Sequence, residues 1–225
     1  MAVIHETTMN PTKVDLLAAW LPRQPWFLGA AKAPRLARAG GFRLDDPAGE
    51  VGIEFVAGTD RSADQAVTYL MPMTYRGEPL PDGDAALIGT SQHGVLGKRW
   101  IYDGACDLVL ITQLVALIQG QAAPQAQSVS NTADPTVTSR PVANSLLAVT
   151  GSAVEVNGPS GTDLRVQTAS ADGMPGGQLL VRIVRLLEPD AVAPGRGLEQ
   201  PGVSATWRQL DGTTVRGMFA TASFA

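Results

Sequence analysis

The polar residues of this 225-residue chain come closest to a known chemical pattern in one glycine-rich segment. Residues 89–99 read GTSQHGVLGKR. A phosphate-binding loop needs two glycines that free the backbone, a lysine that reaches the phosphates and a Ser or Thr that binds magnesium. Gln92 stands where the first glycine is required, and Arg99 replaces the hydroxyl residue. We therefore predict that Gly94 and Gly97 mark a turn or bulge, with Arg99 on a solvated strand.

Paired carboxylates give no better pattern. Glu50 and Glu54 would lie on one face of a strand, but four residues of strand separate them by about 13 Å. That is beyond the roughly 5 to 9.5 Å used in glycoside hydrolysis. Asp45 and Asp46 precede a proline, which favours an Asx-type turn over a metal site. The sequence predicts no catalytic acid–base pair.

Histidine and cysteine are too few for the usual metal or nucleophile sites. The histidines are His5 and His93, the single cysteine is Cys106, and their spacing matches no zinc motif. No G-x-S-x-G or similar motif points to a Ser-His-Asp or Cys-His arrangement. We predict no metal site, and we expect Cys106 to be a small buried side chain rather than a reactive thiol.

The elements that would position these residues follow the hydrophobic pattern. Asn10-Pro11 supplies an N-cap and a first-turn proline for a helix over 12–21, and the apolar run at 108–118 predicts a second helix. Short strands are predicted in this half at 3–8, 41–44, 51–57, 66–75 and 94–102. The second half is mostly β, with strands predicted at 142–149, 153–156, 164–168, 178–187, 203–209 and 215–220. Asp211-Gly212 between the last two favours a tight hairpin turn.

A change of composition suggests how the chain is divided. Residues 119–140 hold almost no large apolar side chains and are rich in Gln, Ala, Ser and Pro, which suits a solvated linker. We predict a first unit at 1–120, a linker at 121–140 and a β-rich unit at 141–225.

Composition and charge disfavour several classes of protein. With 44% hydrophobic and 17% charged residues, the chain is ordinary for a folded protein. A formal charge of −4 disfavours a surface that tracks nucleic-acid phosphates. No leader pattern opens the sequence, and no window approaches the ~18 to 20 apolar residues of a membrane span. We expect a cytoplasmic protein that binds neither nucleic acid nor membrane.

Four segments in series resemble the N-terminal cap domain of maltokinases. They read GFRLDDP at 41–47, VGIE at 51–54, TYRG at 74–77 and HGVLGKRWIYD at 93–103. The resemblance implies an α+β fold in which a cystatin-like antiparallel sheet packs on a helix, and a role in α-glucan and trehalose metabolism. The motif residues that we expect to be structural are Gly41, Phe42, Arg43, Asp45, Asp46, Tyr75, Arg76, Gly77, Gly97, Arg99 and Trp100.

The second unit resembles part of a kinase N-lobe but lacks the residues of phosphoryl transfer. QLLVRIVRLLEPD at 178–190 is similar to the strand that brings a lysine to ATP in related sugar kinases, and Arg182 occupies the lysine position. Arginine forks where lysine acts as a point charge. Neither histidine is followed by the aspartate of an H-x-D catalytic loop. We expect a stand-alone cap without its catalytic lobe, with no cofactor and no kinase activity.

Three aromatic residues are candidates for contact with a sugar, because the family implied by the resemblance handles α-glucans. They are Trp26, which follows a proline in a loop, and Trp100 and Tyr102, which share a strand face. Packing in a core or an interface is the alternative.

Three functions remain open. The first is a non-catalytic accessory or regulatory protein that binds an enzyme of glycogen, maltose or trehalose metabolism. The second is an α-glucan-binding module that uses these aromatics, and the third is an enzyme of glycogen metabolism with an unfamiliar site.

Overall fold

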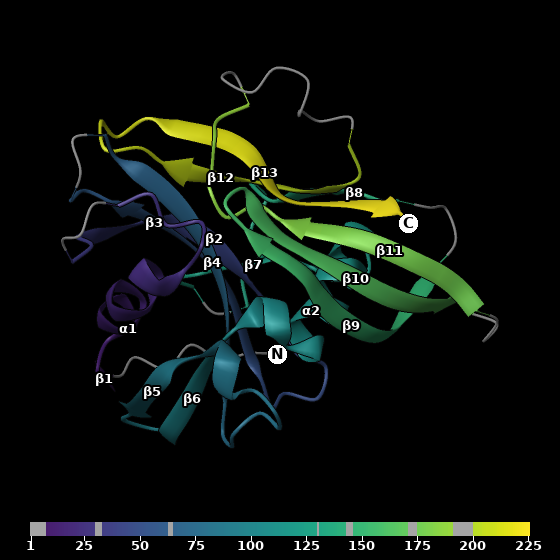
Figure 1. The fold of residues 1–225 in the computed structure, drawn as a ribbon, viewed down its shortest axis with the longest axis horizontal. Helices are drawn as coiled ribbons and strands as arrows, with labels where there is room; N and C mark the ends of the chain where they lie inside the picture. The colour runs from purple at the N-terminus through teal and green to yellow at the C-terminus, as the bar shows by residue number, and fades with distance from the viewer. Residues whose placement is uncertain are drawn as a thin grey trace.

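The computed structural model describes residues 8–29, 33–62, 65–129, 131–142, 146–170, 175–190 and 200–225. His5 and most of the strand predicted at 3–8 lie outside these ranges. Within them the chain forms antiparallel strands, two α-helices and short 3₁₀ turns (Figure 1).

The first half of the chain alternates helix, sheet and helix. Its elements are β1 (Met9–Asn10), α1 (Lys13–Trp20), β2 (Leu36–Leu44), β3 (Gly52–Asp60), β4 (Val67–Arg76), β5 (Leu87–His93), β6 (Gly97–Asp103) and α2 (Leu108–Ile118). Both predicted helices are confirmed, but the N-cap of the first is Thr12 rather than Asn10. Thr12 forms a capping box with Asp15, which satisfies two backbone N–H groups that a helix start otherwise leaves open.

The second half is β throughout. Its elements are β7 (Gln125–Ala126), β8 (Thr138–Arg140), β9 (Leu147–Gly158), β10 (Gly161–Ser170), β11 (Pro175–Ile183), β12 (Gly202–Arg208) and β13 (Thr214–Phe224). The strands predicted at 142–149 and 153–156 are one long strand, β9. The hairpin predicted at Asp211-Gly212 is confirmed between β12 and β13, where Gly212 has a φ of +87°.

One antiparallel path runs through both halves, in the order β1-β5-β6-β4-β3-β2-β12-β13-β11-β10-β9. The two halves meet where Gly40 of β2 pairs with Trp207 of β12. A Cβ on Gly40 would lie 3.2 Å from the Trp207 Cα and the Thr206 carbonyl oxygen, so glycine permits this close approach.

A second connection closes the path into a ring. The chain after β11 runs beside β4, where the Leu70 N–H donates to the Arg185 carbonyl at 2.9 Å and the Leu187 N–H donates to the Thr68 carbonyl at 2.8 Å. On its other side, the Val184 N–H donates to the Phe219 carbonyl of β13. The strands β4, β3, β2, β12 and β13 therefore close around one interior through segment 184–187.

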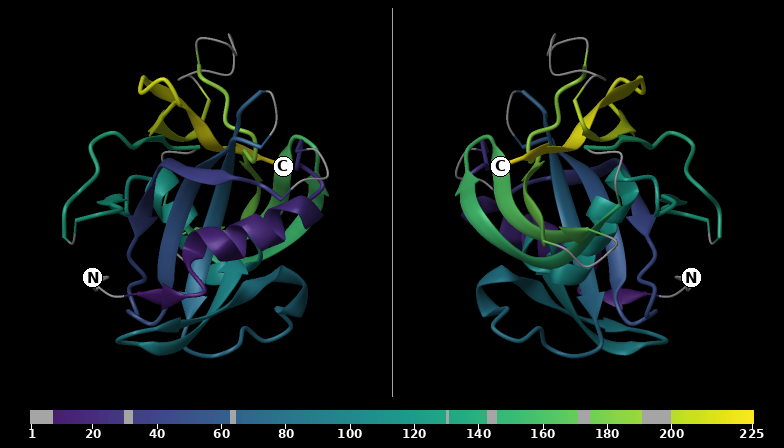
Figure 2. Two further views of the ribbon diagram at one scale, coloured as in Figure 1. Left: turned by 90° about the vertical axis from the view of Figure 1, so that its left-hand side faces the viewer. Right: turned by 90° about the vertical axis from the view of Figure 1, so that its right-hand side faces the viewer.

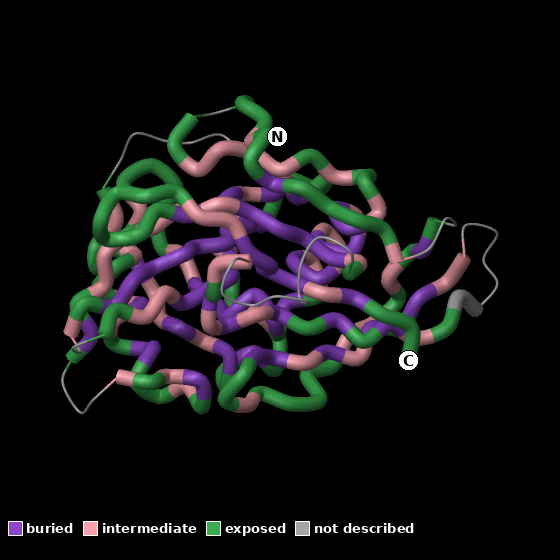
Figure 3. Tube along the Cα trace, turned by 90° about the horizontal axis from the view of Figure 1, so that it is seen from above, coloured by how far each residue is buried: buried purple, intermediate pink, exposed green. Residues whose placement is uncertain are grey.

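Aromatic side chains fill this interior from both halves of the chain. Phe42 and Phe55 stack with ring centroids 4.6 Å apart, and Phe219 lies 5.9 Å from Phe42 and 6.1 Å from Trp207. Such ring pairs add to the stabilisation from buried area. In Figure 3 the buried residues run along the strands through the middle of the molecule, and the exposed ones lie at the loops and edges.

Segment 121–140 is hydrogen-bonded to the sheet at two places. β7 pairs with β2 and β8 pairs with β12. The side-chain amide of Gln127 donates to the Phe55 carbonyl oxygen, and Val137 is buried. The division into units at 1–120 and 141–225 stays a prediction.

The predicted α+β class is confirmed at the level of an antiparallel sheet with two short helices among the described residues. α2 packs its apolar face into the same core as β9 and β10, and α1 covers a second apolar cluster that includes Trp20, Trp26 and Tyr69. Neither described helix is long and apolar enough to cross a bilayer.

A buried arginine ties the two halves together. The Arg185 guanidinium has no solvent exposure and donates from Nη2 to the Asp103 carboxylate at 2.6 Å and from Nε to the Thr162 hydroxyl at 2.8 Å. It also lies 5.0 Å from the centre of the Trp26 ring. Asp103 and Trp26 belong to the first half, whereas Thr162 and Arg185 belong to the second. The pair is therefore an ionic contact between the halves inside the core.

We predict that Asp103→Asn lowers the free energy of unfolding by about 3–5 kcal/mol, because it leaves the Arg185 charge buried without its counter-ion. Urea denaturation followed by tryptophan fluorescence and far-UV circular dichroism would measure the loss. Asp163→Asn is the matched control, because it breaks an Arg–Asp pair on the surface, where the loss should be under about 1 kcal/mol. Equal losses in the two variants would contradict the role assigned to Arg185.

Candidate functional site

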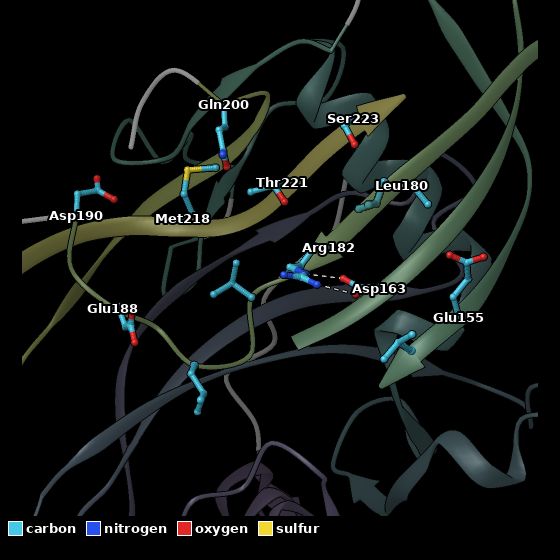
Figure 4. A pocket seen from close by; sticks show the side chains of 14 residues that line it. Glu155, Asp163, Leu180, Arg182, Glu188, Asp190, Gln200, Met218, Thr221 and Ser223 are labelled. Carbon is cyan, nitrogen blue, oxygen red and sulfur yellow. Dashed lines mark hydrogen bonds and ion pairs between the residues drawn. The ribbon is translucent and has the colours of Figure 1, made fainter. Parts of the chain in front are cut away.

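A groove of about 440 Å³ opens on the outer face of β10, β11 and β13 (Figure 4). Segment 184–190 and Gln200 form its other wall. Inward side chains of these strands, such as Leu164, Leu179 and Phe219, fill the core, and most of the groove lining comes from the alternate, outward side chains. The polar side chains that line it are Glu155, Asp163, Arg182, Glu188, Asp190, Gln200, Thr221 and Ser223.

Arg182 lies on this outer face and forms an ion pair with Asp163. Its Nε and Nη2 donate to the two carboxylate oxygens of Asp163 at 2.5 and 2.7 Å, a bidentate pair that is visible in Figure 4. The hydrogen bond from Arg182 holds the pKa of Asp163 below its usual value. Arg182, the residue compared above with the ATP lysine of sugar kinases, is thus already bound to an anion of the protein.

The groove is acidic. Among the described residues, four carboxylates line it, from Glu155, Asp163, Glu188 and Asp190, and Arg182 is the one cation. Glu155 also pairs with Arg165, whereas Glu188 and Asp190 form no ion pair within the described residues. Such a surface repels phosphate and attracts cations.

The glycine-rich segment at 89–99 forms a hairpin instead of a phosphate loop, as predicted. β5 and β6 pair on either side of it, and Gly97 adopts a φ of +70° in the turn. The Arg99 guanidinium donates to the Leu96 carbonyl at 2.9 Å. Arg99, the third residue of β6, thus reaches back to fix the turn.

Several motif side chains stabilise the first half of the chain. A Cβ on Gly41 would lie 1.9 Å from the Phe55 carbonyl oxygen, and φ there is +123°, so only glycine fits. Phe42 is in the core. Asp46 forms the expected Asx-type turn, because its carboxylate accepts from the N–H groups of Ala48, Glu50 and Val51.

Tyr75 belongs to a polar cluster around the buried carboxylate of Glu54. This carboxylate accepts from the Lys13 ammonium at 2.5 Å, the Tyr75 hydroxyl at 2.8 Å and the Gln127 amide at 3.0 Å. Burial and then the Glu54 charge raise the pKa of Tyr75 well above its usual value. Tyr75 therefore stays protonated and donates to Glu54. Arg38 extends the cluster by donating to the side-chain oxygen of Gln127.

Arg76 anchors the start of α2. Its Nε and Nη2 each donate to an oxygen of Asp107 at 2.7 Å, and Asp107 is the N-cap that accepts from the Val109 N–H. Burial alone would raise the pKa of Asp107, but the hydrogen bonds from Arg76 and the backbone outweigh it and hold the pKa below its usual value. Close to this pair, the Arg99 Nη1 approaches the Cα side of Gly77, where a Cβ would lie only 2.9 Å away.

The three aromatic candidates do not share a surface. Trp26 is fully buried against Trp20 and Tyr69, and Tyr102 is buried with its hydroxyl accepting from the Leu80 N–H. Trp100 is partly exposed, with the Lys98 ammonium 4.6 Å from the centre of its ring. Of the three, Trp100 alone can reach a ligand in solution without a change in the core.

Among the described residues, no three His, Cys, Asp or Glu side chains are grouped closely enough to hold a metal. Cys106 is exposed, so the expectation of a buried cysteine was wrong: it sits at the end of a 3₁₀ turn that directs it outward. Partial desolvation of the thiol and then the Asp103 carboxylate raise its pKa to about 11. The thiol is therefore protonated at neutral pH and weakly nucleophilic.

Sequence reasoning singled out Arg182 and missed Arg185. The signal was present in the alternation of residues 179–185, because Leu179, Val181 and Ile183 all point inward and period two places Arg185 on the same side. Gln127 carried no comparable signal, because its role depends on β7 returning to β2.

The structure is an α+β fold, and in its first half, from α1 to η3 (Gly104–Cys106), several motif side chains contact one another or the backbone. Residues 20–107 match the family model of the maltokinase N-terminal cap domain. The resemblance to this domain is therefore confirmed for that part of the chain, which spans β2 to β6 and ends at the N-cap of α2. No curated protein matches the chain.

We predict that Asp107→Asn destabilises the protein by about 3 kcal/mol at pH 7, because the Arg76 guanidinium loses its charged partner. The folded-state pKa of Asp107 is lowered, so its contribution is complete above the unfolded-state value of about 3.9 and is lost as the pH falls below it. Urea titrations from pH 7 to about pH 3 should show the difference between wild type and variant narrowing at acid pH. Glu78→Gln, at an exposed position, is the control and should show the wild-type dependence of unfolding free energy on pH. A difference between wild type and Asp107→Asn that stays constant with pH would contradict the role of the Arg76–Asp107 pair.

Proposed function

We propose that this chain is a non-catalytic accessory or regulatory protein that binds an enzyme of α-glucan, maltose or trehalose metabolism. The observation that carries the proposal is the match of residues 20–107 to the maltokinase N-terminal cap domain. A cystatin-like sheet, a cytoplasmic location and a first unit at 1–120 followed by a β-rich unit at 141–225 are parts of the same proposal.

The state of the polar motif residues supports a role without catalysis. Tyr75 is bound to Glu54 and Arg76 to Asp107, and both acceptors are buried. Side chains that already satisfy one another inside a fold are costly to redirect to a substrate. These contacts support a scaffold, whose outer surface is available to a partner.

The groove supports the same view. A nucleotide site needs cations and backbone N–H groups around the phosphates. The groove instead presents Glu188 and Asp190, and Arg182, the one cation among its described lining residues, is held by Asp163. The α-glucan-binding alternative depends on Trp100, since Trp26 and Tyr102 are buried.

We predict that the purified chain binds at least one of four purified enzymes, with a Kd on the order of 1–10 μM, or about −7 to −8 kcal/mol. The four are a maltokinase lacking its own cap, a trehalose synthase, a maltosyltransferase and a glycogen branching enzyme. Isothermal titration calorimetry would measure binding, and assays of each enzyme with and without the chain would measure regulation.

Two further experiments separate the alternatives. The chain alone, incubated with ATP and maltose, trehalose or glycogen, should yield no product. In native gels that contain glycogen, the wild type and Trp100→Ala should migrate alike, because we expect no glycogen binding through Trp100. Binding to none of the four enzymes would overturn the proposal, and product formation by the chain alone would replace it with the enzyme alternative.

A further inference from the structure

Two surfaces of the molecule have no role in the scaffold described above. One is the turn of the β5–β6 hairpin, residues 93–99, which we call the tip. The other is the acidic groove on β10, β11 and β13. We propose that the protein associates with itself head to tail, with the tip of one copy seated in the groove of the next.

The tip presents two adjacent apolar side chains to solvent. Val95 is 61% exposed and Leu96 is 45% exposed, at the end of a hairpin rather than on a sheet face that another element could cover. Two apolar side chains projecting together from a turn have no stabilising role within one copy. They are the kind of anchor that binds in a partner's pocket.

The tip is also held in one conformation. The Nδ1 atom of His93 accepts from the N–H groups of Val95 and Leu96, at 3.3 and 3.0 Å. From the other strand, the Arg99 guanidinium donates to the Leu96 carbonyl at 2.9 Å. Because these bonds fix the backbone beforehand, the tip loses little conformational entropy when it binds.

The charges at the tip are positive. Lys98 is exposed and lies over the Trp100 ring, and Arg99 follows it in β6. Neither cation forms an ion pair within the part of the chain that the structure describes. The tip is thus an apolar pair beside two cations without acidic partners.

The groove has the complementary character. Val156 and Leu180 contribute exposed apolar surface to its lining, and Met218 adds a flexible apolar side chain. Glu188 and Asp190 at its wall have no cationic partner within the described ranges, and Figure 4 shows both on the segment that borders the groove. An apolar lining beside free carboxylates matches an apolar pair beside free cations, which favours encounter and fixes orientation.

The positions of the two surfaces make the contact intermolecular. The β5–β6 hairpin lies at the lower edge of the molecule in Figures 1 and 2, whereas β13, which forms part of the groove, runs across its upper half. One copy cannot place its tip in its own groove. A contact between two different surfaces is heterologous. When two copies bind, one keeps a free groove and the other a free tip, so further copies can add and the assembly grows into rings or short chains.

The first measurement is the mass of the full-length protein in solution against concentration. Sedimentation velocity at low salt should give a weight-average mass that rises from the 23.5 kDa of one chain as the concentration increases. Added salt at about 1 M should weaken association, since it screens the exposed charges. A protein that stays at 23.5 kDa up to the highest soluble concentration would overturn the proposal.

Two variants then test the two surfaces separately. The double variant Val95→Asp, Leu96→Asp should remove the tip, and the double variant Glu188→Lys, Asp190→Lys should remove the groove. Each should be monomeric by itself while keeping the wild-type circular dichroism spectrum and melting temperature, because the altered side chains lie at the surface. Leu210→Asp is the matched control: Leu210 is 54% exposed in the β12–β13 turn, and its loss should leave self-association intact.

Mixing the two variants gives the decisive result. The tip variant retains an intact groove and the groove variant retains an intact tip, so an equimolar mixture should form a dimer with one of each and grow no further. A mixture that remains monomeric would overturn the head-to-tail contact. Loss of association in the tip variant alone, with the groove variant behaving as wild type, would show instead a symmetric contact between tips.

Discussion

The fold depends on the buried contact of Arg185 with Asp103. A guanidinium without solvent exposure is costly in a protein core unless its charge is matched. Here Nη2 donates to Asp103 and Nε to Thr162, partners from opposite halves of the chain, whereas Nη1 has no hydrogen-bond partner among the described residues. Segment 184–187 carries this arginine between β4 and β13, where it also completes the ring of strands. Hydrogen bonding and charge therefore position the same segment. The aromatic side chains of Phe42, Phe55 and Phe219 pack inside the closed path of strands that this segment completes.

The local elements could be predicted from the sequence because local rules determine them. The two helices, the Asx-type turn at Asp46 and the hairpin at Asp211-Gly212 follow from capping, hydrophobic period and turn chemistry. The closed ring could not be predicted, because it depends on pairings between residues more than a hundred positions apart, such as Gly40 with Trp207. Composition could not show that parts of segment 121–140 pair with the sheet, since a segment poor in large apolar residues can still hydrogen-bond to a strand through its backbone.

The candidate site was harder to predict than the fold. The aromatic residues were chosen by type, but type does not separate an indole in a core from one at a surface, and Trp26 and Tyr102 are in the core. The groove involves strands that come together only after folding, so no motif marks it. The exposed pair Val95 and Leu96 lay within a recognised motif, where the glycines drew attention to the backbone rather than to the side chains between them.

The pairing of β4 shows that the residues matched by the family model are not all the residues that this part of the fold needs. The far end of β4, at 73–76, pairs with β6 inside the matched stretch 20–107, but its near end, at 68–70, pairs with residues 185–187, far outside it. The matched stretch thus includes a strand whose hydrogen bonds it cannot satisfy alone, and it includes Asp103 without the arginine that neutralises it. A fragment cut at the limits of the family match would present an open sheet edge and an unmatched core carboxylate.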